Sequence, residues 1–276
     1  MQRIGIVGLG AMGLPMAATL AAKGFAVTGY DANADRRALF AGAAVSLADL
    51  AGADVVVLSL PNDRIVDEVV SELLGHLAAG AVVVDTSTVA PETTRSLQAS
   101  AAAKGIGHVD APVSGGAAGA AAGTLLVMAG GHAGDIARAR PVLDALARKV
   151  VVCGGPGAGN VVKLANNMLC AGQLLLAGEA LRIAGAGGVA AGDLLEALNA
   201  GSGRSAVTEV NLPRWILSGT FDSAFSMALM SKDVGLAASL DGSGALTGEI
   251  ARRWSEAAAV LGGSADFNRI VEAKVR

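Results

Sequence analysis

Two polar side chains inside an apolar segment are the first candidates for chemistry. Lys163 and Asn167 are four residues apart, which places them on one face of a helix. Asn is a poor helix-interior residue because its amide competes with the backbone for hydrogen bonds, so its presence suggests a function. A lysine donates a proton as an ammonium ion, or accepts one as an amine if its pKa falls from about 10.4. The pair predicts acid–base chemistry; an interdomain salt bridge and capping arrangement is the alternative.

A glycine-rich turn near the N-terminus is the second candidate. The apolar run Arg3–Val7 leads into a G-x-G-x-x-G sequence, and a segment with helical spacing follows at once. The first glycine allows a tight turn, the second lets the backbone approach a pyrophosphate, and the third lets the helix pack against the strand. The helix start offers free N–H groups to phosphates. A plain strand-to-helix turn is the alternative. The predicted dinucleotide site comprises Gly8, Leu9, Gly10, Ala11, Met12 and Gly13.

Asp31 follows the next apolar run, 18 residues after Gly13. A carboxylate there accepts hydrogen bonds from both hydroxyls of the adenosine ribose and repels a 2′-phosphate, so NAD is the predicted cofactor. NADP is the alternative because of Arg36 and Arg37. Either guanidinium could reach a 2′-phosphate if the loop folded back, although we expect both to be solvated on the next helix.

Two loops after predicted strands contribute further candidates, because ligands bind at the carboxyl ends of strands in open α/β sheets. Leu60 and Pro61 follow one strand and are expected to line the cofactor site. Thr88 ends the sequence Asp85-Thr-Ser-Thr88 after another strand. Its hydroxyls either line the nicotinamide ribose or cap the next helix, and Ser87 suits both roles equally.

A third loop, which runs from Asp110 to Gly116, has the composition of an anion site. Ser114 is followed by Gly115 and Gly116, and this sequence can expose consecutive backbone N–H groups. Such a nest suits the carboxylate of a substrate. The alternative is a flexible loop, because small residues continue as far as Gly123.

The elements that must position these residues are visible as short apolar runs that alternate with helical segments up to about residue 155. The runs lack strict in/out alternation, which is typical of strands buried on both faces of a parallel sheet. This alternation indicates a doubly wound α/β domain of the Rossmann type. The predicted strands are Arg3–Val7, Phe25–Tyr30, Asp54–Leu60, Ala81–Asp85, Gly107–Val109, Leu125–Ala129 and Val150–Cys153. The predicted crossover helices are Met12–Lys23, Asn62–Leu77, Pro91–Lys104 and Ala133–Ala147.

The strand pattern ends at a glycine cluster over residues 154–159. A long helix is predicted from Val161 to about Ala186, with Val162, Ala165, Leu169 and Leu176 on one apolar face. Residues 1–159 are therefore expected to form the Rossmann domain, and residues 160–276 an all-α domain joined to it by the long helix. The further predicted helices are Ala191–Asn199, Val207–Leu217, Ala224–Leu240, Leu246–Val260 and Asp266–Val275.

Composition excludes several classes of protein. Hydrophobic residues make up 53% of the chain and charged residues 16%, which argues against disorder. A net charge of −3 provides no basic field for nucleic acid. The most apolar long segment, 161–189, contains charged and amide side chains, so no membrane span is expected. Cys153 and Cys170 are expected to be reduced thiols of a cytoplasmic protein. No metal is expected, because His76, His108 and His132 lack metal-ligand spacing.

Four motifs together resemble the β-hydroxyacid dehydrogenases, in particular 3-hydroxyisobutyrate dehydrogenase-like members. The resemblance covers nearly the whole chain. It implies a Rossmann domain joined by a long helix to an all-α domain that forms dimers or tetramers. It also implies hydride transfer between a nicotinamide and the carbon that carries the 3-hydroxyl of a small hydroxy acid. The motifs are Gly8-Leu-Gly-Ala-Met-Gly-Leu-Pro-Met16, Asp110-Ala-Pro-Val-Ser-Gly-Gly116, Gly159-Asn-Val-Val-Lys-Leu-Ala-Asn-Asn167 and Lys232-Asp233.

The resemblance also implies roles for single residues. Lys163 matches the family's catalytic lysine, which handles the hydroxyl proton or stabilises the alkoxide, and Asn167 matches an amide that helps hold the substrate. The matched carboxylate loop is Ser114, Gly115 and Gly116, and the matched cofactor contacts are Thr88 and Lys232.

Two segments depart from the family pattern and leave the substrate's distal group undefined. Val210–Trp215 replaces a proline-rich segment, and the tract Leu240–Ala245 is shorter than usual. Imine reductases share the architecture but typically lack the lysine, so an imine reductase is one alternative function. A non-catalytic dinucleotide-binding module is the other.

Overall fold

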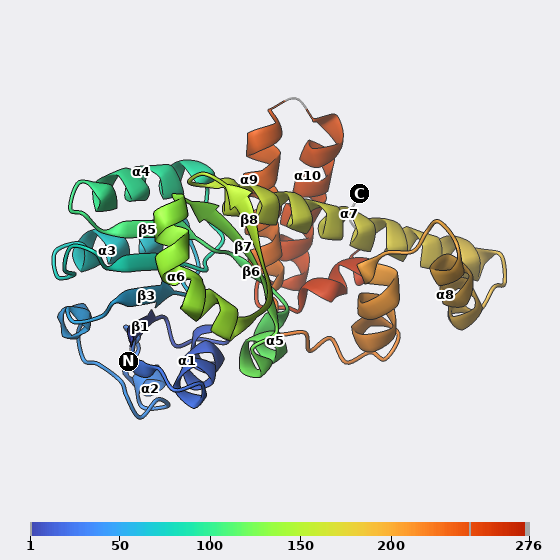
Figure 1. Ribbon diagram of the computed structural model, residues 1–276. Coiled ribbons are helices and arrows are strands. Elements are labelled where there is room, and N and C mark those ends of the chain that lie inside the picture. Colours follow the sequence, from blue (N-terminus) through green and yellow to red (C-terminus); the bar gives the residue numbers. More distant parts are fainter. Residues whose placement is uncertain (1, 243, 274–276) are drawn as a thin grey trace. The chain divides into compact units, whose positions relative to one another are not determined.

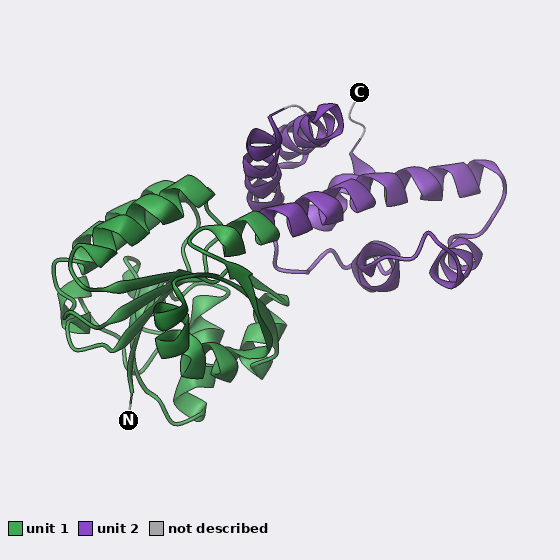
Figure 2. Ribbon diagram, turned by 45° about the horizontal axis from the view of Figure 1, so that its top comes forward, with its two compact units in different colours: residues 1–163 green, residues 164–276 purple. Residues whose placement is uncertain are grey.

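The computed structural model describes residues 2–242 and 244–273. The chain divides into two compact units, residues 1–163 and 164–276 (Figure 2). The first unit contains the strands β1 (Arg3–Val7), β2 (Ala26–Tyr30), β3 (Val55–Leu58), β4 (Val82–Asp85), β5 (Gly107–Asp110), β6 (Val113–Ser114), β7 (Leu125–Gly131) and β8 (Ala147–Gly154). Its helices are α1 (Gly13–Ala22), α2 (Ala34–Arg37), the 3₁₀ turn η1 (Leu47–Leu50), α3 (Asp63–Leu73), α4 (Pro91–Ala102), α5 (Gly116–Ala122) and α6 (Ala133–Leu146).

The sheet of the first unit has the strand order β2-β1-β3-β4-β5-β7-β6, with β8 also paired to β7. Strands β1 to β5 pair in parallel, so their carboxyl ends meet at one edge. The sheet is mixed at its far end, because β7 runs antiparallel to β5 and β6. A buried strand shows the same apolar pattern in either direction, so the pattern did not reveal the reversal.

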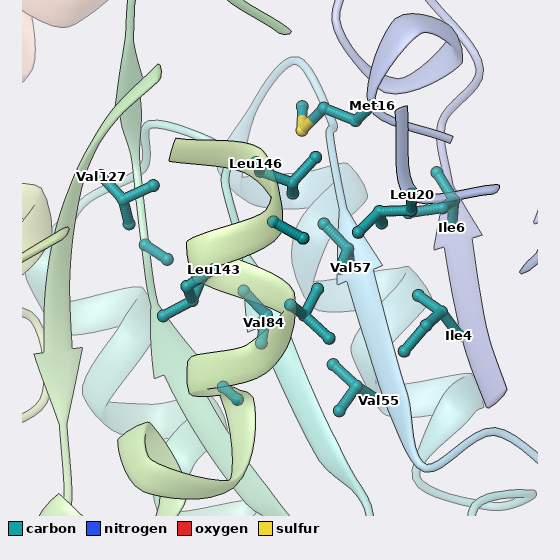
Figure 3. Packing of buried hydrophobic residues seen from close by; sticks show 14 of the residues in the cluster. Ile4, Ile6, Met16, Leu20, Val55, Val57, Val84, Val127, Leu143 and Leu146 are labelled. Carbon is teal, nitrogen blue, oxygen red and sulfur yellow. The ribbon is translucent and has the colours of Figure 1, made fainter. Parts of the chain in front are cut away.

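Helices cover both faces of the sheet, as the predicted Rossmann architecture requires (Figure 1). Val55 and Val57 of β3 point into the cluster under α1 and α6 (Figure 3), whereas Val56 and Leu58 point into the cluster under α3 and α4. Each fully buried side chain of this size stabilises the fold by about 1.5–3 kcal/mol. The sheet edge that carries the predicted site therefore rests on a rigid, close-packed support.

The small-residue tract after Ser114 forms helix α5, so the alternative of a flexible loop was wrong. Alanine has the highest helix propensity of all residues, which explains why a Gly/Ala segment is helical here. The helix ends at Gly123, whose φ of +64° is a left-handed conformation that glycine adopts without strain.

Helix α7 (Ala158–Ala186) begins in the first unit and extends into the second. The described residues of the second unit contain helices and no β-strand of two or more residues. The other elements are α8 (Ala191–Ala200), the π-helix η2 (Val207–Ile216), α9 (Met227–Asp241), α10 (Ala245–Leu261) and the 3₁₀ helix η3 (Phe267–Glu272). The last predicted helix thus ends early, and its positions 274 and 275 lie outside the described residues. The helical C-terminal part predicted from the sequence is confirmed.

The core of the second unit surrounds Trp254, whose indole N–H donates to the carbonyl oxygen of Ala171 at 3.3 Å. Phe225 meets the Phe267 ring edge-to-face, with 5.2 Å between the ring centres. From α7, Ala171 and Leu174 enter this core, whereas Leu169 and Leu176 are each 67% exposed. The apolar face predicted on the long helix therefore exists but faces away from the core.

Helix α7 is long and apolar enough to cross a membrane by length and composition alone. A core helix of a soluble protein passes the same test, and one-third of the most apolar window is buried in the protein. This single helix is therefore weak evidence for a membrane span.

Candidate functional site

The glycine turn between β1 and α1 is tight at its ends and open in its middle. Gly8 has a φ of +92°, and a Cβ added there would lie 2.3 Å from the carbonyl oxygen of Ser59. A Cβ on Gly13 would lie 1.7 Å from the carbonyl oxygen of Gly8. At Gly10, by contrast, a Cβ would meet only Arg36 Nη1, at 3.7 Å, among the described residues. The open backbone at Gly10 fits the approach of a pyrophosphate.

Asp31 is buried at the end of β2 and is fixed by two backbone N–H groups. Its Oδ2 accepts from Leu9 at 2.8 Å, and its Oδ1 accepts from Asn33 at 2.8 Å. The carboxylate thus ties the glycine turn to the second strand and keeps lone pairs for ribose hydroxyls. Arg36 Nη1 lies 3.6 Å from Asp31 Oδ2, so the positive charge that could favour NADP lies beside the acid that favours NAD.

Both arginines lie on α2 but are not equally solvated. The Arg36 side chain is 55% exposed, in agreement with the expectation. Arg37 is only half-exposed, because its Nη1 donates to the carbonyl oxygens of Asp31 at 2.7 Å and Ala32 at 3.1 Å. The loop after β2 is therefore held by Arg37, and Arg36 is the guanidinium beside the Asp31 carboxylate.

The loops after β3 and β4 are joined to each other. The N–H of Leu60 donates to Ser87 Oγ at 2.9 Å, and the N–H of Ser87 donates to Asp85 Oδ1 at 2.9 Å. Ser87 does not cap the next helix, because α4 has Ala90 at its N-cap position. Since Val7, Leu58, Asp85 and the following strand are in register, the loops that carry Pro61 and Thr88 emerge at the edge occupied by the glycine turn.

The loop predicted to bind a carboxylate starts at the same edge. Asp85 pairs with Asp110 in the sheet, and Ser114 then pairs with Leu126 of β7. Gly115 and Gly116 follow with φ angles of +130° and +64°, conformations that favour glycine. Consecutive residues of this kind can turn their N–H groups to one side, as an anion nest requires.

The carboxylate of Asp110 binds the first turn of α7. Its Oδ1 accepts from the N–H of Gly157 at 2.9 Å, and its Oδ2 accepts from the N–H of Asn160 at 3.0 Å. Burial raises the pKa of Asp110, while these N–H groups act in the opposite direction. Lys163 follows within the helix and is 9% exposed. Because α7 begins at Ala158, neither Lys163 nor Asn167 occupies a cap position, so the capping alternative was wrong.

Asn167 belongs to a buried polar cluster of the second unit. Its Nδ2 donates to Asp233 Oδ2 at 2.6 Å, and its Oδ1 accepts from Asn166 Nδ2 at 3.1 Å. Lys232 Nζ lies 2.9 Å from Asp233 Oδ1. Asp233 therefore connects a predicted substrate residue to a predicted cofactor residue. The sequence showed it only as the neighbour of Lys232, and an acid inside an apolar helix was the signal that could have identified it.

The histidines do not form a metal site: the described residues contain no group of three His, Cys, Asp or Glu side chains placed to bind a metal ion. His108 lies inside β5, and neither ring nitrogen has a hydrogen-bond partner within the described chain. Burial lowers the pKa of His108 to about 4.

Comparisons with known proteins agree with this geometry. Residues 3–155 match the family described as the NAD binding domain of 6-phosphogluconate dehydrogenase. Residues 157–274 match the family described as NAD-binding of NADP-dependent 3-hydroxyisobutyrate dehydrogenase. The two matches meet at the glycine cluster before α7 and together cover nearly the whole chain.

Among curated relatives, 2-(hydroxymethyl)glutarate dehydrogenase from Eubacterium barkeri is 39% identical over 85% of this chain and 81% of its own length. NAD-dependent L-serine dehydrogenase from Pseudomonas aeruginosa is 39% identical over 86% of this chain and 84% of its own. The structure of Mycobacterium tuberculosis 3-hydroxyisobutyrate dehydrogenase with L-serine gives a TM-score of 0.92 at 33% identity, covering 99% of this chain and 98% of that one.

An imine reductase from Myxococcus stipitatus is more distant, with a TM-score of 0.68 at 17% identity over 99% of each chain, and shows the fold alone. The Rossmann domain, the helical domain and the relatives' shared activity agree with the motifs in the sequence. The chain belongs to the β-hydroxyacid dehydrogenase family and is an NAD(P)-dependent hydroxyacid dehydrogenase.

Proposed function

We propose that this dehydrogenase acts on a small 3-hydroxy acid of the 3-hydroxyisobutyrate type, prefers NAD to NADP, and uses Lys163 as its general acid/base. The observation that carries the proposal is the burial of Lys163 on α7, one turn before Asn167. The polar pair lies in a mainly apolar helix, where burial of such residues costs free energy, so their presence suggests a function.

The names of the relatives support this class of substrate. They specify 2-(hydroxymethyl)glutarate, L-serine and 3-hydroxyisobutyrate. All three compounds contain the unit HOCH₂–CH(R)–COO⁻ and differ in the group R. We therefore infer that the Ser114–Gly116 loop binds the shared carboxylate, and that the size and charge of R distinguish this enzyme's substrate.

A bound nicotinamide would supply the hydride acceptor for the carbon that carries the hydroxyl, and the Gly8–Gly13 turn, Asp31 and Thr88 would hold this cofactor. Lys163, as a neutral amine, takes the hydroxyl proton during oxidation and returns it during reduction. Asn167 helps hold the substrate.

The test is the initial rate of NAD and NADP reduction at alkaline pH with 3-hydroxyisobutyrate, L-serine, glycerate and 3-hydroxypropionate. We expect Lys163→Ala to lower kcat about 10²- to 10⁴-fold on the best substrate, without a large change in the Kd for NAD. Lys149→Ala, which removes an exposed lysine of the same unit, is the matched control and should retain wild-type turnover. Wild-type turnover by Lys163→Ala would contradict the mechanism.

The same assay separates the alternative functions. Reduction of a cyclic imine without activity on hydroxy acids would favour an imine reductase. Tight NAD binding without turnover of any hydroxy acid or imine would favour a non-catalytic module. The presence of Lys163, Asn167 and the Ser114–Gly116 loop favours the dehydrogenase.

We assign cofactor binding to residues 1–159, and substrate selection and oligomerisation to residues 160–276. We further propose a homodimer or homotetramer with no nucleic-acid or membrane partner. The chain has only two cysteines, Cys153 and Cys170, which supports placement in the reducing cytoplasm.

A further inference from the structure

We propose that Asn160 is a positioning residue, which fixes the loop carrying Thr88 to the helix carrying Lys163. The inference rests on the proposed function, because it assigns Asn160 an effect on the general acid/base and on a cofactor contact. Asn160 would touch neither substrate nor cofactor and would act only through these two residues.

Three hydrogen bonds converge on Asn160, which is fully buried. Its Oδ1 accepts from the N–H of Val89 at 3.1 Å, directly after Thr88. Its Nδ2 donates to Thr94 Oγ1 on α4 at 3.1 Å. Its backbone N–H donates to Asp110 Oδ2 at 3.0 Å. One residue therefore connects the end of β5, the loop after β4, and helices α4 and α7.

The Asn160 side-chain amide satisfies one buried donor and one buried acceptor at the same time. Its side-chain oxygen accepts from a buried backbone N–H, and its nitrogen donates to a buried hydroxyl, so each end of the amide has one matching partner. A buried N–H without a partner costs free energy, which disfavours any state in which Val89 separates from Asn160. The loop with Thr88 is thus held against α7 by a specific bond as well as by packing.

The helix itself has little freedom at this point. A Cβ on Gly159 would lie 2.3 Å from the carbonyl oxygen of Met128, so the first turn of α7 lies directly on β7. Asn160 and Lys163 are three residues apart, which places them on neighbouring positions of one helix face. The rotation of α7 that buries the Asn160 amide therefore also determines the direction of Lys163.

Asn160→Ala removes both side-chain bonds and releases the loop with Thr88 from the first turn of α7, which keeps its backbone bonds to Asp110. Because a displacement of about 1 Å in a catalytic group can cost about 10²-fold in rate, we expect kcat at saturating NAD to fall about 10- to 100-fold. We expect the Kd for NAD, measured by titration calorimetry, to rise several-fold, because the loop that carries Thr88 loses the bond between Val89 and Asn160.

Two double-mutant cycles separate this role from a general loss of stability. In the Lys163→Ala background, Asn160→Ala should change the residual kcat less than about twofold, because the group it positions is absent. In the Thr88→Ala background, Asn160→Ala should change the NAD Kd less than about twofold. Equal effects of Asn160→Ala with and without Lys163, and with and without Thr88, would overturn the proposal.

Thr94→Val is the control for stability. It removes the partner of Asn160 Nδ2 but leaves the bond to Val89, so the melting temperature should fall while kcat stays within about twofold of wild type. If Thr94→Val and Asn160→Ala lose kcat in proportion to their loss of melting temperature, the effect belongs to folding and the proposal fails. Should Lys163→Ala itself retain full turnover, the proposed function fails separately, and the NAD-binding cycle with Thr88 still decides whether Asn160 positions the loop.

Discussion

Asp31 and Arg36 place opposite charges next to the position expected for the adenosine ribose. The carboxylate accepts two backbone N–H groups and is buried, so it cannot turn away from a 2′-phosphate. The guanidinium is exposed and 3.6 Å away, so it can move towards solvent or towards a phosphate. This fixed negative charge supports the proposed preference for NAD.

We predict that Asp31→Asn lowers the ratio of NADP Kd to NAD Kd about tenfold, because it removes one negative charge near the 2′-phosphate and frees Arg36 from its ion pair. The two Kd values can be measured by titration calorimetry. Asp35→Asn is the matched control, since Asp35 is an exposed acid on α2, the helix that carries Arg36. Equal wild-type affinities for NAD and NADP would contradict the assignment of Asp31.

Strand β5 buries a polar side chain that lowers the stability of the fold. His108 has no hydrogen-bond partner among the described residues. Burial lowers the pKa of this imidazole from 6.5 to about 4. The unfolded chain therefore binds one more proton than the folded chain between these pH values, so stability decreases as the pH falls. Asp110 opposes this trend, because its raised pKa makes protonation favour the folded state.

We predict that His108→Leu raises the free energy of unfolding above that of wild type at pH 4–5. This gain should be up to about 3 kcal/mol larger at pH 4–5 than at pH 7. Taking the difference between variant and wild type cancels the contribution of Asp110. The measurement is the free energy of unfolding by urea at each pH, with exposed His76→Gln as control. A difference that does not change with pH would show that His108 is not the titrating group.

The sequence predicted those helices and strands well that depend on residues close together in the chain. The β-branched runs identified strands β1 to β5, and the G-x-G-x-x-G turn identified the start of α1. The direction of β7 and the helical state of α5 were missed, because apolar pattern and small residues are compatible with more than one conformation. The role of Asn160 was missed because its side-chain partners are 71 and 66 residues away along the chain, where spacing contains no signal.

At the scale of the whole molecule, α7 presents an apolar stripe to solvent. Leu169, Leu176 and Ile183 recur every seven residues and are 67%, 67% and 74% exposed. Apolar periodicity alone could not distinguish such a stripe from a face that enters the core of the same chain. A seven-residue apolar repeat suits packing against another helix, and we assign it to the proposed contact with a second copy.

We predict that Leu176→Glu converts the oligomer into a smaller species, because it places a charge in the centre of the stripe. Light scattering coupled to gel filtration measures the mass. Leu246→Glu, at a leucine on α10 that is 72% exposed, should leave the mass unchanged. A monomeric wild type, or equal dissociation by both variants, would refute the assignment.

Lys163 and Asn167 belong to different compact units but to one uninterrupted helix. Their separation is therefore set by helical geometry, in which each residue adds a rotation of about 100°. One inserted or deleted residue between them would turn the amide from the lysine's face towards the side of the helix. The number of residues between Lys163 and Asn167 is therefore as essential to the pair as the identity of its two members.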